Sequence, residues 1–167
     1  NKAAVIIANP NGINVNGGGF INTSRATLVT GNSNLNDAGD AITSFTIGAN
    51  SLSITGDGLN GKTTDYLDIV AKNISIDGQI NGKILNLLGG VDSYDYVNNS
   101  GTTTDTTATT SYSIDASTFG GMYANAITIK ATNAGLGVRI ASDSGAMAGD
   151  FTIDSTGLRG GSITCRI

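Results

Sequence analysis

The sequence predicts an all-β fold of the solenoid type, a parallel β-helix. Short segments rich in Ile, Leu and Val recur through the chain, and Gly, Asn or Asp follows most of them. Helix-forming residues are diluted by glycine and by β-branched residues, which favour turns and strands. One phrase also repeats, because Ser53–Lys62 resembles Ser75–Lys83 with an offset of 22 positions from Ile54 to Ile76. That offset is about one coil of a β-helix.

The predicted strands are the short apolar segments. In chain order they are Ala3–Ala8, Ser44–Ile47, Ser51–Ile54, Leu67–Val70, Asn73–Ile76, Ile84–Leu88, Ser111–Ile114, Ala126–Ile129, Gly137–Ile140 and Phe151–Ile153. A single coil cannot cover its own apolar face, so stacking of neighbouring coils has to bury the inward-facing Ile, Leu and Val. A second phrase, Ile-Asp after Ser or Thr, places Ile114 and Ile153 39 positions apart. We expect these two residues to be separated by about two coils.

One stretch, Val91–Tyr112, breaks this rhythm. It contains two tyrosines, an Asn-Asn-Ser-Gly sequence at 98–101 and a threonine-rich run from Thr102 to Thr110. Asn99-Ser100-Gly101 predicts the tip of a hairpin, with alternating threonines returning to Tyr112. We therefore expect an excursion from the coils, either an extra-helical β-hairpin or a solvated loop.

Composition excludes several classes of function. The net charge is −4, and the nine Lys and Arg are scattered, which argues against nucleic acid as a partner. The chain has no histidine, the most frequent general base and metal ligand. The lone Cys165 cannot form an intrachain disulfide, and no apolar run approaches the roughly 18 residues of a membrane span. Without a signal peptide or an initiating methionine, the chain is expected to be a fragment of a longer precursor.

Two strings near the start carry a more specific signal. The first is Asn-Pro-Asn-Gly-Ile at 9–13, and the second is Gly-Phe-Ile-Asn-Thr-Ser-Arg at 19–25. Together they resemble the haemagglutination-activity segment of the two-partner-secretion domain, which occurs in filamentous haemagglutinins, haemolysins and contact-dependent inhibition proteins. The residues that carry the resemblance are Asn9, Pro10, Asn11, Gly12 and Ile13, supported by Gly19, Phe20, Asn22 and Arg25.

This resemblance implies a right-handed parallel β-helix with extra-helical hairpins. It also implies a secreted exoprotein at the surface of a Gram-negative bacterium. In the unfolded state, the chain is expected to be recognised by the periplasmic domains of an outer-membrane two-partner-secretion transporter. Residues 1–119 then correspond to the C-terminal part of the secretion domain, 120–158 to the first β-helical repeats, and 159–167 to a tail of uncertain origin.

The function implied by the resemblance is non-catalytic support of secretion and of adhesion to host or neighbouring cells, with no cofactor. The same domain also serves as the delivery stalk of haemolysins and growth-inhibition toxins, so that alternative stays open. The family's segment upstream of Asn9 is missing, which leaves the first coil uncovered. We expect self-association through this uncapped end.

Two interpretations of the motif residues remain open. Asn9–Gly12 has the residues of a tight turn, since proline fixes φ and Asn-Gly accepts positive φ. The motif therefore acts either as a corner of the coil or as a sequence that the transporter contacts. Arg25 and Arg139 either bind a carboxylate of a glycan or partner, or pair with a nearby Asp on the outer face, worth about 0–1 kcal/mol if exposed.

Candidate sites for catalysis and metal binding are weak. Some parallel β-helices cleave polysaccharides, and glycoside hydrolysis needs two carboxylates about 5–9.5 Å apart. Asp65 with Asp68, Asp92 with Asp95, and Asp77 from a neighbouring coil are the available carboxylates. Most Asp residues, however, lie in turn sequences that account for them. The single Gly56–Gly61 phrase is too short for a tandem calcium-binding repeat, so we expect neither a catalytic site nor a metal site.

Overall fold

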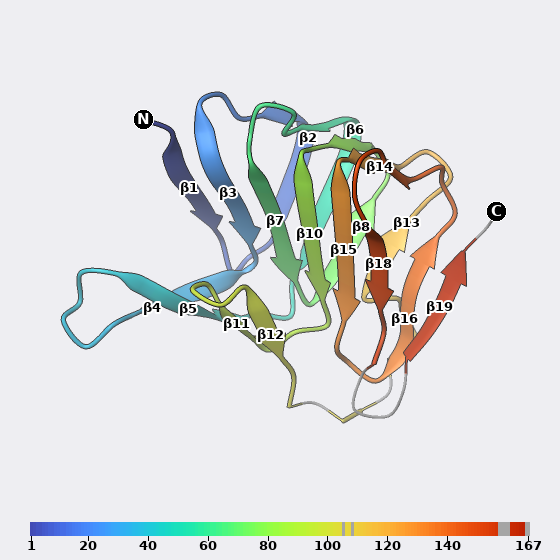
Figure 1. Cartoon of the computed structure of the whole chain (residues 1–167). Helices are drawn as coiled ribbons and strands as arrows, with labels where there is room; N and C mark the ends of the chain where they lie inside the picture. Colours follow the sequence, from blue (N-terminus) through green and yellow to red (C-terminus); the bar gives the residue numbers. More distant parts are fainter. Residues whose placement is uncertain (105, 108, 157–160, 166–167) are drawn as a thin grey trace.

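The chain folds as a stack of β-coils, seen in Figure 1 as a row of parallel strands. The computed structural model describes residues 1–104, 106–107, 109–156 and 161–165. One face of the stack is a six-stranded parallel sheet, here called sheet A. Its strands, in spatial order, are β1 (Ala3–Ala8), β3 (Thr23–Val29), β7 (Tyr66–Ala71), β10 (Ile84–Gly89), β15 (Ala126–Ala131) and β18 (Phe151–Asp154).

The remaining faces belong to a nine-stranded parallel sheet, sheet B. Its branch point is β6 (Ser51–Asn60), whose first half pairs with β8 (Asn73–Ile76) and whose second half pairs with β9 (Gln79–Asn81). On its other side β6 pairs with β2 (Ile13–Gly19). The branch from β8 continues through β13 (Ile114–Ala116), β16 (Gly135–Ile140) and β19 (Gly161–Cys165), and the branch from β9 through β14 (Gly121–Ala124) and β17 (Gly145–Ala146).

Strand register confirms the coil length inferred from the sequence. Ile54 pairs directly with Ile76, one coil apart at the predicted offset of 22 positions. Side chains alternate along each strand, so every second residue of a coil points inward. The inward-facing Leu, Ile, Val and Ala form one continuous core along the stack. Burying each large aliphatic side chain contributes about 1.5–3 kcal/mol. The predicted all-β parallel solenoid is therefore confirmed.

The second repeat inferred from the sequence is wrong. Ile114 lies on β13 in sheet B and pairs with Val138, whereas Ile153 lies on β18 in sheet A and pairs with Ile129. The two Ile-Asp phrases therefore occupy different faces of the stack. They look alike because in each short strand an inward Ile is followed by an outward Asp, a pattern that any face of a coil can use.

Two hairpins leave the stack and form a third sheet on its outer side. This extra-helical sheet is antiparallel and lies against sheet A at the lower left of Figure 1. Its strands, in spatial order, are β12 (Ser100–Thr102), β11 (Ser93–Asp95), β5 (Ile42–Ile47) and β4 (Gly31–Leu35). The strand predicted at Ser44–Ile47 thus exists but belongs to a hairpin and not to a coil.

A second hydrophobic core holds the extra-helical sheet in place. Phe45 and Tyr94 are fully buried, with ring centroids 6.1 Å apart in a stacked arrangement. They cover Val29, Val70 and Leu88, which point outward from three neighbouring strands of sheet A. Because the hairpins are inserted between coil strands, the chain advances 18 residues from Leu67 to its partner Leu85 but 42 from Leu85 to its partner Ile127.

The excursion predicted within Val91–Tyr112 is a hairpin. β11 and β12 pair antiparallel, and Asn99 before β12 adopts a positive φ of 50°. The sequence predicted that alternating threonines would continue the strand to Tyr112, but the described residues 103–104 and 106–107 are not in a strand, and residues 105 and 108 lie outside the described part of the chain. Instead, the Asp92 carboxylate accepts hydrogen bonds from the Thr103 hydroxyl and from the Thr104 N–H and hydroxyl, at 2.8–3.2 Å. The pairing of β11 with β12 therefore ends at Thr102, because the local Asp–Thr hydrogen bonds replace the hydrogen bonds between the two strands.

Candidate functional site

The Asn-Pro-Asn-Gly motif forms a tight turn between β1 and β2. The Gly12 N–H donates to the Asn9 carbonyl at 3.2 Å, and the Asn11 N–H donates to the Asn9 Oδ1 at 3.0 Å. Gly12 has a φ of 105°, which a residue with a Cβ adopts only under strain. Asn9 therefore closes the turn with both its main chain and its side chain, in the manner of an Asx-turn.

Neighbouring segments hold this turn from two sides. The Asn9 N–H donates to the Val29 carbonyl at the end of β3, at 3.0 Å. The Asn50 side chain, just after the β4–β5 hairpin, donates to the Pro10 carbonyl at 2.9 Å. The Ile13 side chain is partly buried against the main core, while Asn11 is exposed. Of the five motif residues, Asn11 thus offers a side chain that is both exposed and not used by the turn.

The residues of the second motif shape the corner between β2 and β3. A Cβ on Gly19 would lie 3.1 Å from the Asn60 carbonyl, so the close approach of the two coils favours glycine there. The Phe20 side chain packs against the end of the main core. Asn22 adopts a left-handed φ of 57°, and its carbonyl accepts the Ala3 N–H at 3.1 Å. These positions have evident structural roles in the folded chain.

Arg25 connects sheet A to the extra-helical sheet. Its Nε donates to the Asp68 carboxylate at 2.6 Å, and its two terminal nitrogens donate to the Tyr96 carbonyl at 2.9 Å and the Tyr94 hydroxyl at 2.8 Å. The guanidinium carbon lies 4.1 Å from the centroid of the Tyr96 ring. Burial lowers the pKa of Arg25, but the hydrogen bond and charge of Asp68 outweigh burial, so the net pKa is raised. Its charge is therefore permanent at any ordinary pH.

Asp68 is a buried carboxylate that accepts hydrogen bonds from three side chains on the two neighbouring strands, β3 and β10. Its side chain is 1% exposed. Oδ2 accepts from Arg25 and from the Thr27 hydroxyl at 3.3 Å, while Oδ1 accepts from the Asn86 amide at 2.7 Å. Thr27, Asp68 and Asn86 occupy the same register position on β3, β7 and β10. These three side chains therefore form a polar layer beneath the hairpins. A buried charge persists only when paired and hydrogen-bonded in this way.

Both arginines singled out from the sequence pair with an aspartate, but in different environments. Arg139 forms a two-bond pair with Asp115 at 2.6 and 2.7 Å, and its side chain is 41% exposed. This is the outer-face pair expected from the sequence. Arg25 pairs with a carboxylate that solvent does not reach, so the prediction of a weak exposed pair is wrong for Arg25 because the extra-helical sheet covers it.

The carboxylates considered for glycoside hydrolysis have separate structural partners. Asp68 is closed off beneath the hairpins, while its neighbour Asp65 lies at the surface between two lysines. Asp95 accepts from the N–H groups of Val97 and Asn98 in the β11–β12 turn. Within the described residues, no group of three or more His, Cys, Asp or Glu could hold a metal ion. In the same part of the chain, no helix has the length and apolar character to cross a membrane.

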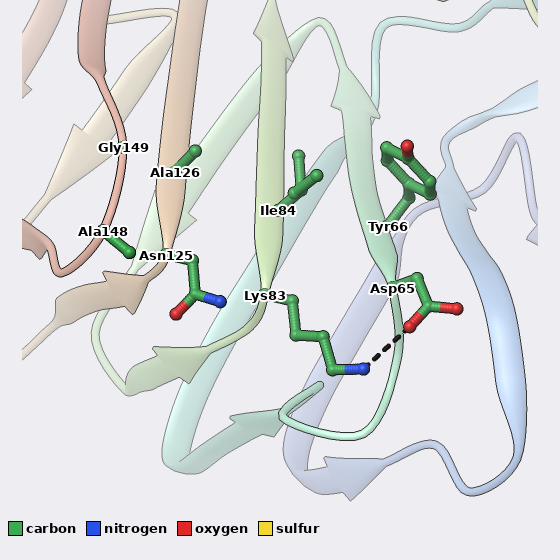
Figure 2. Close-up of a pocket in the computed structure, with 8 residues that line it drawn as sticks. All are labelled: Asp65, Tyr66, Lys83, Ile84, Asn125, Ala126, Ala148 and Gly149. Carbon is green, nitrogen blue, oxygen red and sulfur yellow. Dashed lines mark hydrogen bonds and ion pairs between the residues drawn. The ribbon is translucent and has the colours of Figure 1, made fainter.

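Asp65 forms one wall of a surface hollow of about 380 Å³ at the start of three sheet A strands, shown in Figure 2. Lys83 reaches across it to Asp65 at 2.7 Å, and Lys2 binds the same carboxylate at 2.7 Å. The hydrogen bonds from Lys2, and then from Lys83, lower the pKa of Asp65. Hydrogen bonding to Asp65 in turn raises the pKa of Lys83. Asp65 and Lys83 therefore remain charged near neutral pH.

Sequence reasoning missed Asp68, Tyr94 and Tyr96 as partners of Arg25. It also missed Asn86 as a partner of Asp68. One signal was available, since Asp68 interrupts the otherwise apolar strand segment Leu67–Val70. A carboxylate inside such a strand indicates a buried cation or a set of donors nearby. The sequence does not identify Arg25 as this cation, because Arg25 lies 43 positions from Asp68. It does not identify Tyr94 as a further partner either, because Tyr94 lies on an inserted hairpin.

Fold and motifs together define the class of this protein: a parallel β-helical domain whose first coils are tied to an extra-helical antiparallel sheet. The chain belongs to the TPS secretion domain family, whose model matches residues 1–164. In three dimensions it is similar to the crystal structure of the filamentous hemagglutinin secretion domain. The TM-score is 0.69 at 23% identity, covering 99% of this chain and 67% of the other. That likeness supports the fold, and the family match supports the secretion domain.

Relatives in sequence are much longer proteins. The chain is 39% identical over 157 residues to a tRNA nuclease CdiA-2 of Burkholderia pseudomallei, covering 93% of this chain. It is 35% identical over 159 residues to a toxin CdiA of Yersinia pestis, covering 94% of this chain. In both cases the chain spans 5% of the relative's length. Membership of this family places the chain in a secreted exoprotein at the surface of a Gram-negative bacterium.

Proposed function

We propose that this chain is the non-catalytic segment of a large exoprotein that an outer-membrane transporter recognises through its periplasmic domains during two-partner secretion. Its coils then fold at the cell surface, where the exoprotein supports adhesion to host or neighbouring cells. The family match supports the secretion role. The main candidate carboxylates, Asp65 and Asp68, are held in ion pairs and hydrogen bonds that explain them structurally.

In this proposal the chain has three parts. Residues 1–119 form the C-terminal part of the secretion domain, 120–158 form the first β-helical repeats, and 159–167 form a tail whose described strand, β19, pairs with β16 of sheet B. A closed turn at the first boundary, with the Gly120 N–H donating to the Ser117 carbonyl at 3.1 Å, supports the division there. Part of the tail lies outside the described residues.

The main support for the proposal is that, in the folded turn, most motif residues are engaged in contacts within the chain. Asn9 closes the turn, Pro10 binds Asn50, and Ile13 packs against the core. A transporter that contacts these side chains must therefore meet them before the coil forms. We infer that the motif is recognised in the unfolded chain, and that turn formation afterwards helps to hold the first coils in place.

The test compares Asn9→Ala with Asn11→Ala. Loss of the Asn9 side chain removes the acceptor for the Asn11 N–H, so the denaturation midpoint of the isolated chain should fall; a lost cap of this kind costs about 1 kcal/mol. Asn11→Ala should leave that midpoint unchanged, because its side chain is exposed. In the whole exoprotein expressed with its transporter, both variants should reduce secretion, measured as protein in the medium.

The two variants separate the two possible roles of the motif. Reduced secretion of Asn11→Ala at an unchanged midpoint supports recognition of the unfolded motif. Normal secretion of Asn11→Ala, with a defect in Asn9→Ala alone, contradicts it and leaves the turn a purely structural element. Asn36→Ala provides the control, since Asn36 closes a hairpin turn elsewhere through its own side chain.

A second function is favoured by the sequence relatives. Those at 39% and 35% identity are named as a nuclease and a toxin. We propose as the alternative that the chain begins the delivery stalk of a growth-inhibition toxin or haemolysin. A gene for a small immunity protein directly downstream, able to protect cells that express it, supports growth inhibition. A precursor without a toxic C-terminal domain supports adhesion instead.

A further inference from the structure

The hollow of Figure 2 has an apolar floor made by one register row of sheet A. Tyr66, Ile84 and Ala126 are direct partners on β7, β10 and β15, and their side chains point outward together. The turn at Ala148 and Gly149 closes one side. The Tyr66 side chain is 49% exposed. Farther along the same strands the extra-helical sheet covers the face, so this row is the part that the hairpins leave open.

A polar rim borders the floor. Asp65, Lys83 and Asn125 each directly precede one of these strands and therefore stack at the same corner of three successive coils. Figure 2 shows the Lys83 and Asn125 side chains on the same side of the strands as the Tyr66 ring. The Asp65 carboxylate binds both Lys83 of the rim and Lys2, which does not line the hollow, so Asp65, Lys83 and Lys2 together carry one net positive charge. In a chain with a net charge of −4, this positive charge beside the hollow favours an anion locally.

The backbone around the hollow is already hydrogen-bonded. The Ile84 N–H donates to the Asp65 carbonyl at 3.3 Å, the Ala126 N–H to the Lys83 carbonyl at 3.1 Å, and the Gly149 N–H to the Asn125 carbonyl at 2.7 Å. An extended peptide has no open strand edge to pair with here, so peptide recognition by β-augmentation is disfavoured. A ligand must instead be held by side chains: an exposed aromatic ring, an ammonium, a carboxylate and an amide.

We propose that this hollow is a binding site for a sugar residue that carries a carboxylate, such as a uronic acid. The C–H face of the sugar ring lies on Tyr66 and Ile84, and its carboxylate accepts hydrogen bonds from Lys83 and Asn125. Asp65 keeps Lys83 in position and accepts from sugar hydroxyls. The volume of about 380 Å³ is within the range of small-molecule sites. Exposed sites of this kind bind weakly, so many copies on a cell surface would act through multivalency.

The test is a titration of the isotope-labelled chain, followed by amide chemical shifts in NMR. The probes are methyl galacturonoside, the uncharged methyl galactoside, and an acetylated Leu-Asp dipeptide as the peptide alternative. We expect the galacturonoside to shift the amides of residues 65–66, 83–84 and 125–126. It should bind at least about tenfold more tightly than the galactoside, and its affinity should fall as salt is added.

Matched variants assign the effect to the hollow. Lys83→Gln should weaken galacturonoside binding at least about fivefold, and Tyr66→Leu should weaken both sugars. Lys130→Gln, which removes an exposed lysine from β15 outside the hollow, should bind like the original chain. Equal binding of the two sugars, tighter binding of the dipeptide, no shifts with any probe, or shifts that map elsewhere would each overturn the proposal.

Discussion

At the scale of single residues, Arg25 makes strand β3 of sheet A and the extra-helical sheet depend on each other. Its three donors go to three different residues, of which two belong to the β11–β12 hairpin. Lysine could not replace it, because an ammonium lacks the planar fork that reaches a carboxylate, a carbonyl and a hydroxyl at once. An arginine at this point of the motif is therefore explained by the fold without any contact to a transporter.

Replacing Arg25 by methionine should lower the free energy of unfolding by about 3–5 kcal/mol, since Asp68 would remain as an uncompensated buried charge. Denaturant titration followed by circular dichroism measures this loss. The double variant Arg25→Met with Asp68→Asn should lose less than Arg25→Met alone, because the buried charge has gone as well. Arg139→Met serves as the control. Its pair with Asp115 is partly exposed, and we expect a loss of only about 0–1 kcal/mol. Equal losses for the two arginines would contradict the assigned role of Arg25.

At the scale of strands, the sequence predicts the coils well and the inserted sheet poorly. The offset from Ile54 to Ile76 is visible because no hairpin interrupts that coil. The segment Ser44–Ile47 has the same alternation as a coil strand, and local composition does not distinguish antiparallel from parallel pairing. Only the identity of the partner strands decides whether pairing is antiparallel or parallel, and the partners of β5 are β4 and β11. Within the candidate site, the turn at Asn9–Gly12 was predictable from residue types, whereas the contacts of Arg25 depend on where an insertion folds back.

Close approach between strands at the coil corners also limits which residues fit there. Gly120 lies between the turn at Ser117 and β14, and a Cβ there would overlap the Ile76 carbonyl oxygen of the preceding coil. Gly145 on β17 has no atom within 4 Å of the same position. The two glycines thus form a natural pair for comparison, because neither has a positive φ.

We expect Gly120→Ala to destabilise the chain by about 1–3 kcal/mol, the usual cost of forcing an extra group into a packed site. Gly145→Ala should be neutral, or stabilising by up to about 1 kcal/mol, since alanine restricts the unfolded chain. Thermal unfolding of both variants, monitored by circular dichroism, gives the comparison. If Gly120→Ala unfolds at the same temperature as the original chain, the coils do not approach at this corner as the structure indicates.

At the scale of the whole molecule, the stack of coils ends in strands that have a neighbour on one side only. Its first coil exposes two large apolar side chains: Ile7 is 43% exposed and Ile21 is 91% exposed. Among the described residues, β1 pairs only with β3, and β2 pairs only with β6. Each of these two strands therefore has one edge whose backbone groups are open to another strand. Exposed apolar groups beside open strand edges favour association between chains.

The isolated chain should accordingly self-associate through this end, and light scattering coupled to size-exclusion chromatography should show a mass above 16.8 kDa that increases with concentration. Ile21→Lys should shift the population toward monomer, because it places a charge beside the open edge without disturbing the core. Val97→Lys makes the same change at a 69% exposed side chain in the β11–β12 hairpin, outside the coils, and should have no effect. Should the original chain be monomeric at all concentrations, the open edges must be protected by their own twist or by polar side chains. If Val97→Lys dissociates the assembly as strongly as Ile21→Lys, the contact lies on the extra-helical sheet and not at the end of the stack.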